Sequence, residues 1–372
     1  MSFIKIGKFE LYPLEKDSDL EDCYENAQED YCNQFDIPFI DKCTDTIDRM
    51  TKKGSVCIRL DIKEQCYTIE SIYTIPNETN YLGLKDEYFN AKLWSLRECN
   101  PLVVYVYALE YTDKLDLSGT NIEDVSALGK VPSLNLSGTN VVDVSSLRNV
   151  HTLNLSGTNV KDVSALGNVC SLDLSGTNVR DVSSLGKGNV RFLNLRNTKV
   201  VDVSTLGNIS FLNLCSTNVV DVSGLGNVIV LNLSYTRIKD VSALGGPGQH
   251  TLILSGTEVE DVSALSNVRV IDLANTKVAD VSSLGNGKIH TLDLSCTKVA
   301  DVSALGNVHT LNLSDTKVAD VSALGNVHTL DISGTKVTDV SALGGPEQYF
   351  VNLTGTKVVD ISSLANVKTV VR

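Results

Sequence analysis

Hydrophobic positions repeat along the chain every 19 residues from Leu115 onward, in the pattern LxLSGTxVxDVSALGNVxx. Nine of the intervals between consecutive copies are 19 residues long and four are 21. A fixed period of this length is the signature of a solenoid, in which each repeat buries its apolar edge only against its neighbours. The pattern therefore predicts thirteen stacked coils, followed by a partial coil. The copies begin at Leu115, Leu134, Leu153, Leu172, Leu193, Leu212, Leu231, Leu252, Ile271, Leu292, Leu311, Leu330 and Val351, and the partial coil begins at Val370.

Two hydrophobic spacings within each copy predict its local structure. Leu at positions 1 and 3 alternates with polar residues, which is typical of a strand with one buried face. Val at positions 8 and 11 and Leu at position 14 recur every three residues, which suits a short 3₁₀ turn. Nineteen residues leave no room for a full helix, so we expect each coil to contain one short strand and one tight turn.

Two polar columns are constant in all thirteen copies: Thr at position 6, from Thr120 to Thr356, and Asp at position 10, from Asp124 to Asp360. A short hydroxyl side chain can satisfy backbone groups where the strand turns away. Asp followed by Ser two residues later is a helix-start signal. We interpret both columns as structural. A row of Asp that binds cations is the alternative, but a constant column cannot encode specificity for a partner.

The repeats resemble a known family. Strings such as LDLSGTNIEDVSALG and LDISGTKVTDVSALG resemble leucine-rich repeats, whose hallmark is LxxLxLxxNxL, with Thr here in the usual Asn position. The DVSAL segment is similar to the Asp-Ile-Ser-Pro-Leu turn of the internalin subclass. Near-identical copies with SGT and ALGNVHTL are most similar to leucine-rich repeat proteins of giant DNA viruses of the marseillevirus type. Over residues 115–372 the resemblance implies an α/β repeat fold: a right-handed solenoid with a parallel β-sheet and a convex side of short 3₁₀ turns and loops.

Residues 1–114 have a different composition. They contain ten of the 12 Tyr, the only Trp, both Met and none of the five His, with 13 Lys plus Arg against 22 Asp plus Glu. Apolar runs at 56–62, 66–75 and 102–111 predict strands, and 18–31 and 42–50 are candidate helices. We therefore predict two domains, a small α+β capping domain over 1–114 and the solenoid over 115–372. The last strand of the first domain is expected to cover the core of the first coil.

The sequence favours a cytoplasmic protein, in the host cytoplasm or the virion if it is viral. The start MSFIKIGKFELYP lacks the charged leader and apolar core of a secretory signal, and no window approaches 18 apolar residues. Nine Cys form an odd set without paired motif spacing, which favours reduced thiols. We expect no membrane association.

Catalytic motifs are missing from the sequence: there is no Walker loop, GxSxG elbow, HExxH or CxxC pair. We predict no catalytic residue, no metal site and no cofactor. All five His occupy the column two residues before the strand Leu, where imidazoles could bind a transition metal, but the same column also tolerates Cys, Arg, Ser, Ile and Lys. A row of Lys at position 7, from Lys277 to Lys357, could attract phosphates. Because the chain is acidic at −13 and the row lacks aromatic residues, we interpret it as a solvated, locally neutralised edge and expect no nucleic-acid partner.

The exposed strand-face positions 19, 2, 4 and 5 are small and polar in most coils, but not in the coils that begin at Leu193, Leu212, Leu231 and Leu252. Clustered aromatic and Arg side chains are typical anchors of protein interfaces. Drift in a repeat array without a partner is the other explanation. The predicted partner-binding residues are Arg191, Phe192, Arg196, Asn197, Phe211, Cys215, Val230, Tyr235 and Ile253, with Ile229 beside them.

We thus predict a non-catalytic scaffold that binds a protein partner of unknown identity on the strand face. One alternative is an adaptor whose N-terminal domain recruits a second factor such as ubiquitination machinery, although the Leu-Pro start and basic, Trp-bearing end of an F-box are missing. Another is an enzymatic or metal-binding activity in the N-terminal region or the His column. Residues 367–372 end the repeat array without a polar cap, and such an open core edge predicts a homodimer through this end.

Overall fold

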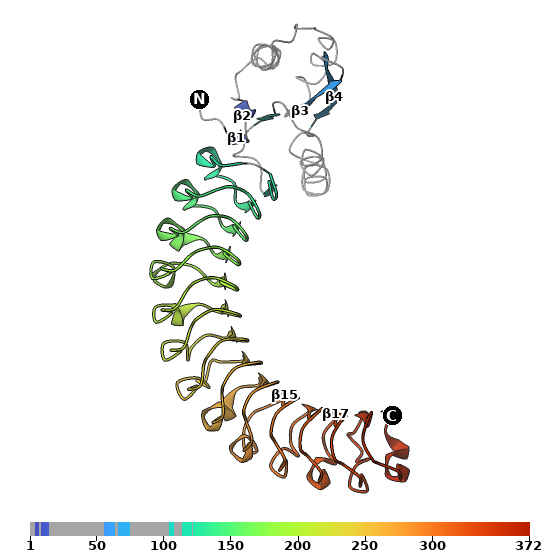
Figure 1. Ribbon diagram of the computed structural model, residues 1–372. Helices are drawn as coiled ribbons and strands as arrows, with labels where there is room; N and C mark the ends of the chain where they lie inside the picture. Colours follow the sequence, from blue (N-terminus) through green and yellow to red (C-terminus); the bar gives the residue numbers. More distant parts are fainter. Residues whose placement is uncertain are drawn as a thin grey trace. The chain divides into compact units, whose positions relative to one another are not determined.

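The computed structural model describes residues 114–120 and 122–372, and before them the backbone of five strands (Figure 1). Those strands are β1 (Ile4–Ile6), β2 (Phe9–Leu14), β3 (Val56–Lys63), β4 (Cys66–Thr74) and β5 (Val104–Tyr107). They form a sheet of their own in the order β1-β2-β5-β3-β4. The three predicted strands correspond to β3, β4 and β5, whereas β1 and β2 were not expected. The candidate helices at 18–31 and 42–50, and the predicted cover over the first coil, lie outside the described residues.

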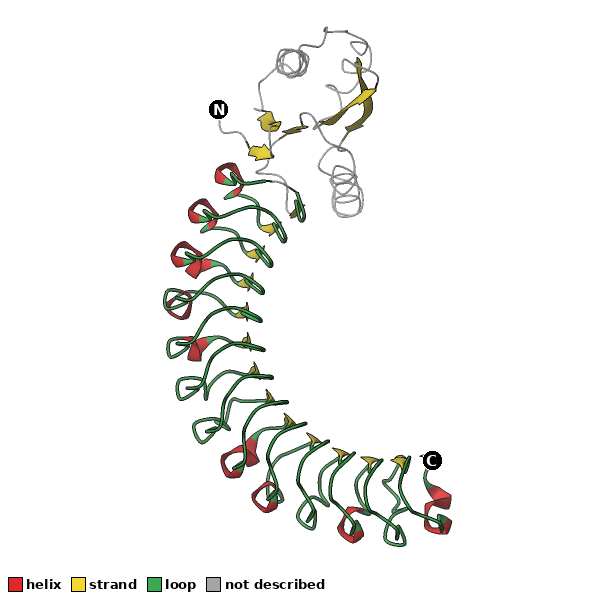
Figure 2. Ribbon diagram, in the orientation of Figure 1, coloured by secondary structure: helices red, strands yellow, loops and turns green. Residues whose placement is uncertain are grey.

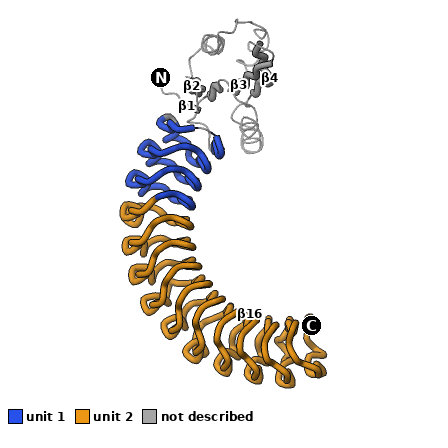
Figure 3. The backbone as a smooth tube through the Cα atoms, in the orientation of Figure 1, with its two compact units in different colours: residues 1–178 blue, residues 179–372 orange. Residues whose placement is uncertain are grey.

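The chain divides into two compact units, residues 1–178 and 179–372 (Figure 3). Fourteen strands of three residues each form one parallel sheet, whose order follows the chain from β6 to β19. In the register of the sheet, each strand Leu lies beside the equivalent Leu of the next coil, as Leu193 beside Leu212 and Leu212 beside Leu231. The first unit contains β6 (Lys114–Asp116), β7 (Ser133–Asn135), β8 (Thr152–Asn154) and β9 (Ser171–Asp173). The second contains β10 (Phe192–Asn194), β11 (Phe211–Asn213), β12 (Val230–Asn232), β13 (Thr251–Ile253), β14 (Val270–Asp272), β15 (Thr291–Asp293), β16 (Thr310–Asn312), β17 (Thr329–Asp331), β18 (Phe350–Asn352) and β19 (Thr369–Val371).

The predicted tight turn takes the form of a 3₁₀ helix in nine of the described coils and of a hydrogen-bonded turn in the others. In the unit that begins at residue 179, the strands lie along one side of the coils and these helices along the opposite side (Figure 2). The segments are too short for an α-helix, as the 19-residue repeat predicts. They are η3 (Ser126–Leu128), η4 (Ser145–Leu147), η5 (Ser164–Asn168), η6 (Leu185–Lys187), η7 (Leu206–Asn208), η8 (Ser263–Asn267), η9 (Ser282–Leu284), η10 (Ser322–Leu324) and η11 (Ser362–Asn366).

The core consists of the six apolar columns at positions 1, 3, 8, 11, 14 and 17. In the coil that begins at Leu311 all six side chains are at most 2% exposed. Full burial of an aliphatic side chain contributes roughly 1.5–3 kcal/mol. Because one coil has no apolar layer on its own, this stabilisation depends on the neighbouring coils. The six residues of that coil are Leu311, Leu313, Val318, Val321, Leu324 and Val327.

Both constant polar columns bind backbone groups, which confirms the structural interpretation. The Thr hydroxyl at position 6 donates to the carbonyl of the Leu or Ile three residues earlier in every coil, for example from Thr236 to Leu233 at 2.6 Å. The carboxylate at position 10 accepts the backbone N–H of the Ser two residues later, for example Asp240 from Ser242 at 2.8 Å. These bonds hold both ends of the segment between strand and turn.

A third polar column, at position 2, was not recognised from the sequence as structural. In twelve coils its Asn or Asp side chain accepts the backbone N–H of the residue two positions later, as Asn232 does from Ser234 at 2.9 Å. This Asx turn starts the bend at the end of the strand. The remaining coil has Ile253 at position 2, whose apolar side chain cannot accept the bond.

Position 5, at the tip of this bend, has a positive φ in all thirteen coils. Gly occupies it in seven coils, with φ between +66° and +72°, because Gly enters the left-handed region without a steric cost. In the other six coils an L-residue takes the same conformation, including Asn197 and Tyr235. Asn tolerates this region, whereas an aromatic side chain is costly there.

The four 21-residue repeats each contain two extra residues in the loop that leads to the next strand, and in two of these inserted loops a buried Gln occupies the apolar column at position 17. The side-chain oxygen of Gln249 accepts the N–H of Gly245 at 2.7 Å, and that of Gln348 accepts the N–H of Gly344 at 2.6 Å. The two Gln side chains are 3% and 4% exposed. Each therefore ties its own inserted loop to the core, where the other coils have Val or Ile.

Acid should weaken the solenoid through the Asp column. In Asp202, Asp221 and Asp261 the pKa is lowered below 3.8, mainly by the hydrogen bond from the backbone N–H of the Ser two residues later and secondly by that from its hydroxyl. In Asp240 and Asp280 the hydroxyl of that Ser makes the larger contribution to the lowered pKa. A pKa lowered in the folded state gives stability that is present above the unfolded pKa and is lost as pH falls through the folded pKa. We therefore expect the urea concentration at the unfolding midpoint to decrease once the pH is lowered below about 4.

Replacing these five Asp by Asn should flatten that decline, because an amide oxygen still accepts the Ser N–H but does not titrate. Urea unfolding followed by circular dichroism between pH 2.5 and pH 7 measures the effect, and an Asp315→Asn variant is the matched control outside the column. An unchanged slope in the five-fold variant would exclude the column as the acid-sensitive element.

Candidate partner-binding face

The strand face of the second unit carries a stacked aromatic pair. Phe192 of β10 and Phe211 of β11 are register partners, with ring centroids 4.6 Å apart and planes at 14°. They remain 45% and 41% exposed, respectively, where most other coils have Thr or Ser. Adjacent strands lie about 4.8 Å apart, so rings at equivalent positions stack without a change in the backbone. The pair presents one continuous apolar surface to the solvent.

Tyr235 and Ile229 are further exposed apolar residues of the next coil, Tyr235 at the tip of the bend and Ile229 directly before β12. Tyr235 is 66% exposed, and its ring lies against the backbone of Gly256 in the following coil, where any Cβ would clash with it. Ile229 is 42% exposed. Val230 of β12 is paired with Phe211 and half-buried. All three predicted aromatic residues are thus exposed, and the structure stacks two of them, Phe192 and Phe211, on each other.

Two Arg residues lie close to Phe192 in the sequence, one directly before it and the other at position 4 of its coil. Arg191 and Arg196 are exposed, and neither forms an ion pair among the residues that the structure describes. Arg191 makes one long hydrogen bond, from Nη1 to the carbonyl of Asn208 at 3.4 Å. Asn197, also exposed, occupies the tip of the bend with φ +57°. All three positions are therefore accessible to a partner.

Cys215 is the least accessible of the predicted site residues: it is only 8% exposed, and its thiol lies 3.5 Å from the hydroxyl of Ser216. Equivalent positions of neighbouring coils are so close that a small side chain is covered by larger neighbours. Ile253 is half-buried on β13, paired with Asn232.

Two exposed apolar residues were missed from the sequence. Val201 and Val220 are each 54% exposed, and they belong to the same coils as Phe192 and Phe211. Both occupy position 9, just after the bend, where five coils carry a charged residue such as Lys239, and where Val142 and Val359 are exposed as well, at 57% and 85%. The apolar character of these two coils therefore continues beyond the strand face.

The His column forms a stack rather than a chelating site. The rings of His290, His309 and His328 are stacked, with 4.4 Å between the centroids of successive rings and at most 16° between their planes. Tyr349 continues the stack, with its ring centroid 5.3 Å from that of His328. Because the lone pairs of imidazole lie in the ring plane, parallel rings cannot direct them at one ion. Burial, then the neighbouring His290 and His328, lowers the pKa of His309. Within the described residues, no group of three or more His, Cys, Asp or Glu could hold a metal ion.

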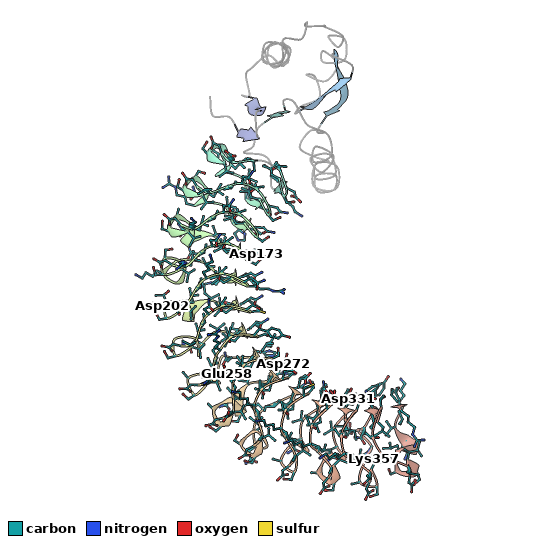
Figure 4. The ribbon with its side chains drawn as sticks, viewed as in Figure 1. Asp173, Asp202, Glu258, Asp272, Asp331 and Lys357 are labelled. Atoms are coloured by element: carbon teal, nitrogen blue, oxygen red, sulfur yellow. The ribbon has the colours of Figure 1, made fainter. Side chains whose placement is uncertain are left out.

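The Lys column is exposed, and its first member is paired. Lys277 lies 3.2 Å from Glu258, which also binds Lys239 at 3.3 Å. Among the described residues, no Lys of this column from Lys277 to Lys357 forms an ion pair with an Asp of position 10. Those Asp carboxylates accept hydrogen bonds from Ser instead. Figure 4 labels Lys357 away from Asp331, which lies by the strands. Over the same described ranges, no helix has the length and apolar character needed to cross a bilayer.

Comparisons with known proteins identify the fold. No protein-family model matches the chain, and no curated protein matches it significantly. Among solved structures it is similar to an internalin, InlF, from Listeria monocytogenes, with 23% identity, a TM-score of 0.61 and coverage of 70% of this chain and 87% of that one. The functional domain of InlJ from the same organism matches with 20% identity, a TM-score of 0.55 and coverage of 76% and 72%.

The leucine-rich repeat domain of APL1 is similar at 12% identity, with a TM-score of 0.55 and coverage of 66% of this chain and 74% of that one. At sequence identities this low, the structural similarity shows the fold alone. The likeness to giant-virus proteins, the cytoplasmic location and the domain boundary at residue 114 stay predictions from the sequence. The parallel sheet, the short 3₁₀ turns and these structural neighbours together make the chain a leucine-rich repeat solenoid.

Proposed function

We propose that this chain is a non-catalytic scaffold that binds a protein partner on its strand face, over the coils from Arg191 to Ile253. Curved repeat proteins typically use such extended faces for binding. The observation that carries the proposal is that these coils break the rules of the repeat at a cost in stability. Such violations are expected at functional sites.

Three costs coincide in this region. Tyr235 holds the left-handed conformation that costs an L-residue roughly 1–2 kcal/mol. Ile253 forgoes the Asx hydrogen bond that the other twelve coils keep, worth about 1 kcal/mol. Phe192 and Phe211 expose large apolar surfaces to water. Neutral drift favours none of these changes, whereas a protein interface uses exposed aromatic side chains as anchors.

The aromatic anchors should be required for binding but not for folding. We expect a Phe192→Ser, Phe211→Ser, Tyr235→Ser variant to lose at least about 30-fold in affinity, since an interface anchor contributes about 2 kcal/mol or more. The measurement is affinity capture from the native cell with quantitative mass spectrometry, followed by titration of the captured partner. A Val142→Ser, Tyr349→Ser, Val359→Ser variant removes exposed apolar groups elsewhere. Equal capture by both variants would refute the proposed face.

Restoring the repeat at Ile253 should stabilise the solenoid. Asn at this position can accept the N–H of Ser255, so Ile253→Asn is expected to raise the unfolding free energy by about 1 kcal/mol. The reverse exchange one coil earlier, Asn232→Ile, should lower it by a similar amount. Urea unfolding measures both. If neither variant shifts the midpoint, position 2 carries no stability cost and the argument from Ile253 fails.

We also propose that two copies pair through the C-terminal edge of the sheet. β19 has a strand neighbour only on the β18 side, and Val371 on it is 38% exposed. Val358 and Ile361 are partly exposed, whereas the equivalent Val337 and Val340 of the preceding coil are 0% and 1% exposed. A two-fold axis beside β19 would pair the free strand edge and cover this apolar end.

Light scattering at increasing concentration should then give twice the monomer mass of 40.2 kDa. A Val371→Lys variant should remain a monomer, because two like charges would face each other across the axis. Val142→Lys, at an exposed position away from β19, is the control. A wild-type monomer at about 100 µM, a concentration well above a micromolar Kd, would contradict the pairing.

A further inference from the structure

The proposed face lies in a basic stretch of an acidic chain. Residues 179–240 contain seven Lys or Arg and four Asp, a net charge of +3, whereas the whole chain carries −13. All four Asp belong to position 10, where each carboxylate accepts a Ser backbone N–H. The basic residues are Arg180, Lys187, Arg191, Arg196, Lys199, Arg237 and Lys239.

Two of these cations bracket the aromatic pair. Arg191 directly precedes Phe192, and Arg196 follows it at position 4 of the same coil. Lys239 is already paired with Glu258, whereas neither Arg has a carboxylate partner among the described residues. Guanidinium groups bind carboxylates in bidentate geometry and also lie over aromatic rings. The surface therefore combines apolar anchors with two available carboxylate-binding groups.

The strand face changes sign beyond Ile253. Position 2 is Asn in the three coils from β10 to β12, but it becomes Asp in β14, β15 and β17. Figure 4 shows Asp272 and Asp331 along the strands, while Asp202 lies on the other side of the coils. Burial raises the pKa of Asp272, and the nearby carboxylate of Asp293 raises it further. The hydrogen bond from the Ala274 N–H acts in the opposite direction. A carboxylate-rich ligand is thus attracted to β10–β12 and repelled from β14–β17.

We propose that the partner contacts β10–β12 with an acidic segment of polypeptide whose aromatic or aliphatic side chains pack against Phe192 and Phe211. The proposal rests on the proposed function and adds the chemistry of the ligand. Arg191 and Arg196 bind the carboxylates of this segment. The Asp residues of β14, β15 and β17 repel it, so that it binds over the basic coils. Electrostatic complementarity of this kind chiefly sets orientation, specificity and association rate.

The test uses the full chain and a defined probe, a fluorescein-labelled random copolymer of glutamate and tyrosine, in fluorescence anisotropy. The copolymer should bind with a Kd below about 100 µM, and Arg191→Glu with Arg196→Glu should weaken it at least ten-fold. The matched control, Arg269→Glu with Lys298→Glu, makes the same change in net charge outside the basic coils and should retain binding within about two-fold. A copolymer of lysine and tyrosine is attracted to the acidic remainder of the chain, so the exchanges at Arg191 and Arg196 should not weaken its binding.

Three results would overturn the acidic-segment proposal: no binding of the glutamate copolymer, equal losses in both charge-reversed variants, or tighter binding of a single-stranded oligonucleotide that depends on the same two Arg. Failure of the proposed function is distinguishable from these. If the cellular partner is lost with the aromatic Ser variant but kept with the Arg191→Glu, Arg196→Glu variant, the binding face stands and its acidic ligand does not.

Discussion

The fold depends on the contact between one coil and the next. A strand of three residues has no stability of its own, and each strand inside the sheet is hydrogen-bonded to a neighbour on both sides. The pairing continues past the strand into the bend, where the N–H of Leu214 donates to Asn232 at 2.8 Å and that of Ser216 to Ser234 at 2.9 Å. The same stacking buries the six apolar columns. The stacking of one coil on the next therefore both forms the backbone hydrogen bonds and buries the core, and it does so in the same way along the chain.

Side chains supply the hydrogen bonds that such short elements lack. Within a coil the Asx residue at position 2, the Thr at position 6 and the Asp at position 10 each bind a nearby backbone group, as Asn232, Thr236 and Asp240 do. These bonds are local, so they impose the same residue types in every coil. A coil that lacks one of them is consequently informative. Ile253 stands out because the surrounding repeat defines what the stable choice would be.

Rows of like side chains arise in this fold from repetition alone. Equivalent positions are one strand spacing apart, so successive His residues stack and successive Lys residues line up. A row by itself is therefore weak support for a binding site. The coils from Arg191 to Ile253 differ because repetition fails there in several columns at once. Exposed aromatic rings, two Arg without an ion pair among the described residues and a locally positive sequence charge coincide in these coils.

Sequence alone determined the number of coils, the place of each strand, the buried columns and the backbone-binding role of Thr and Asp, because all of these follow from periodicity and from interactions within one coil. It also located the irregular face. Only the tertiary structure decided that Cys215 is covered, that Phe192 and Phe211 stack, that Tyr235 lies on Gly256 and that Val201 and Val220 are exposed. These properties depend on distances between side chains of different coils, which a one-dimensional pattern does not contain.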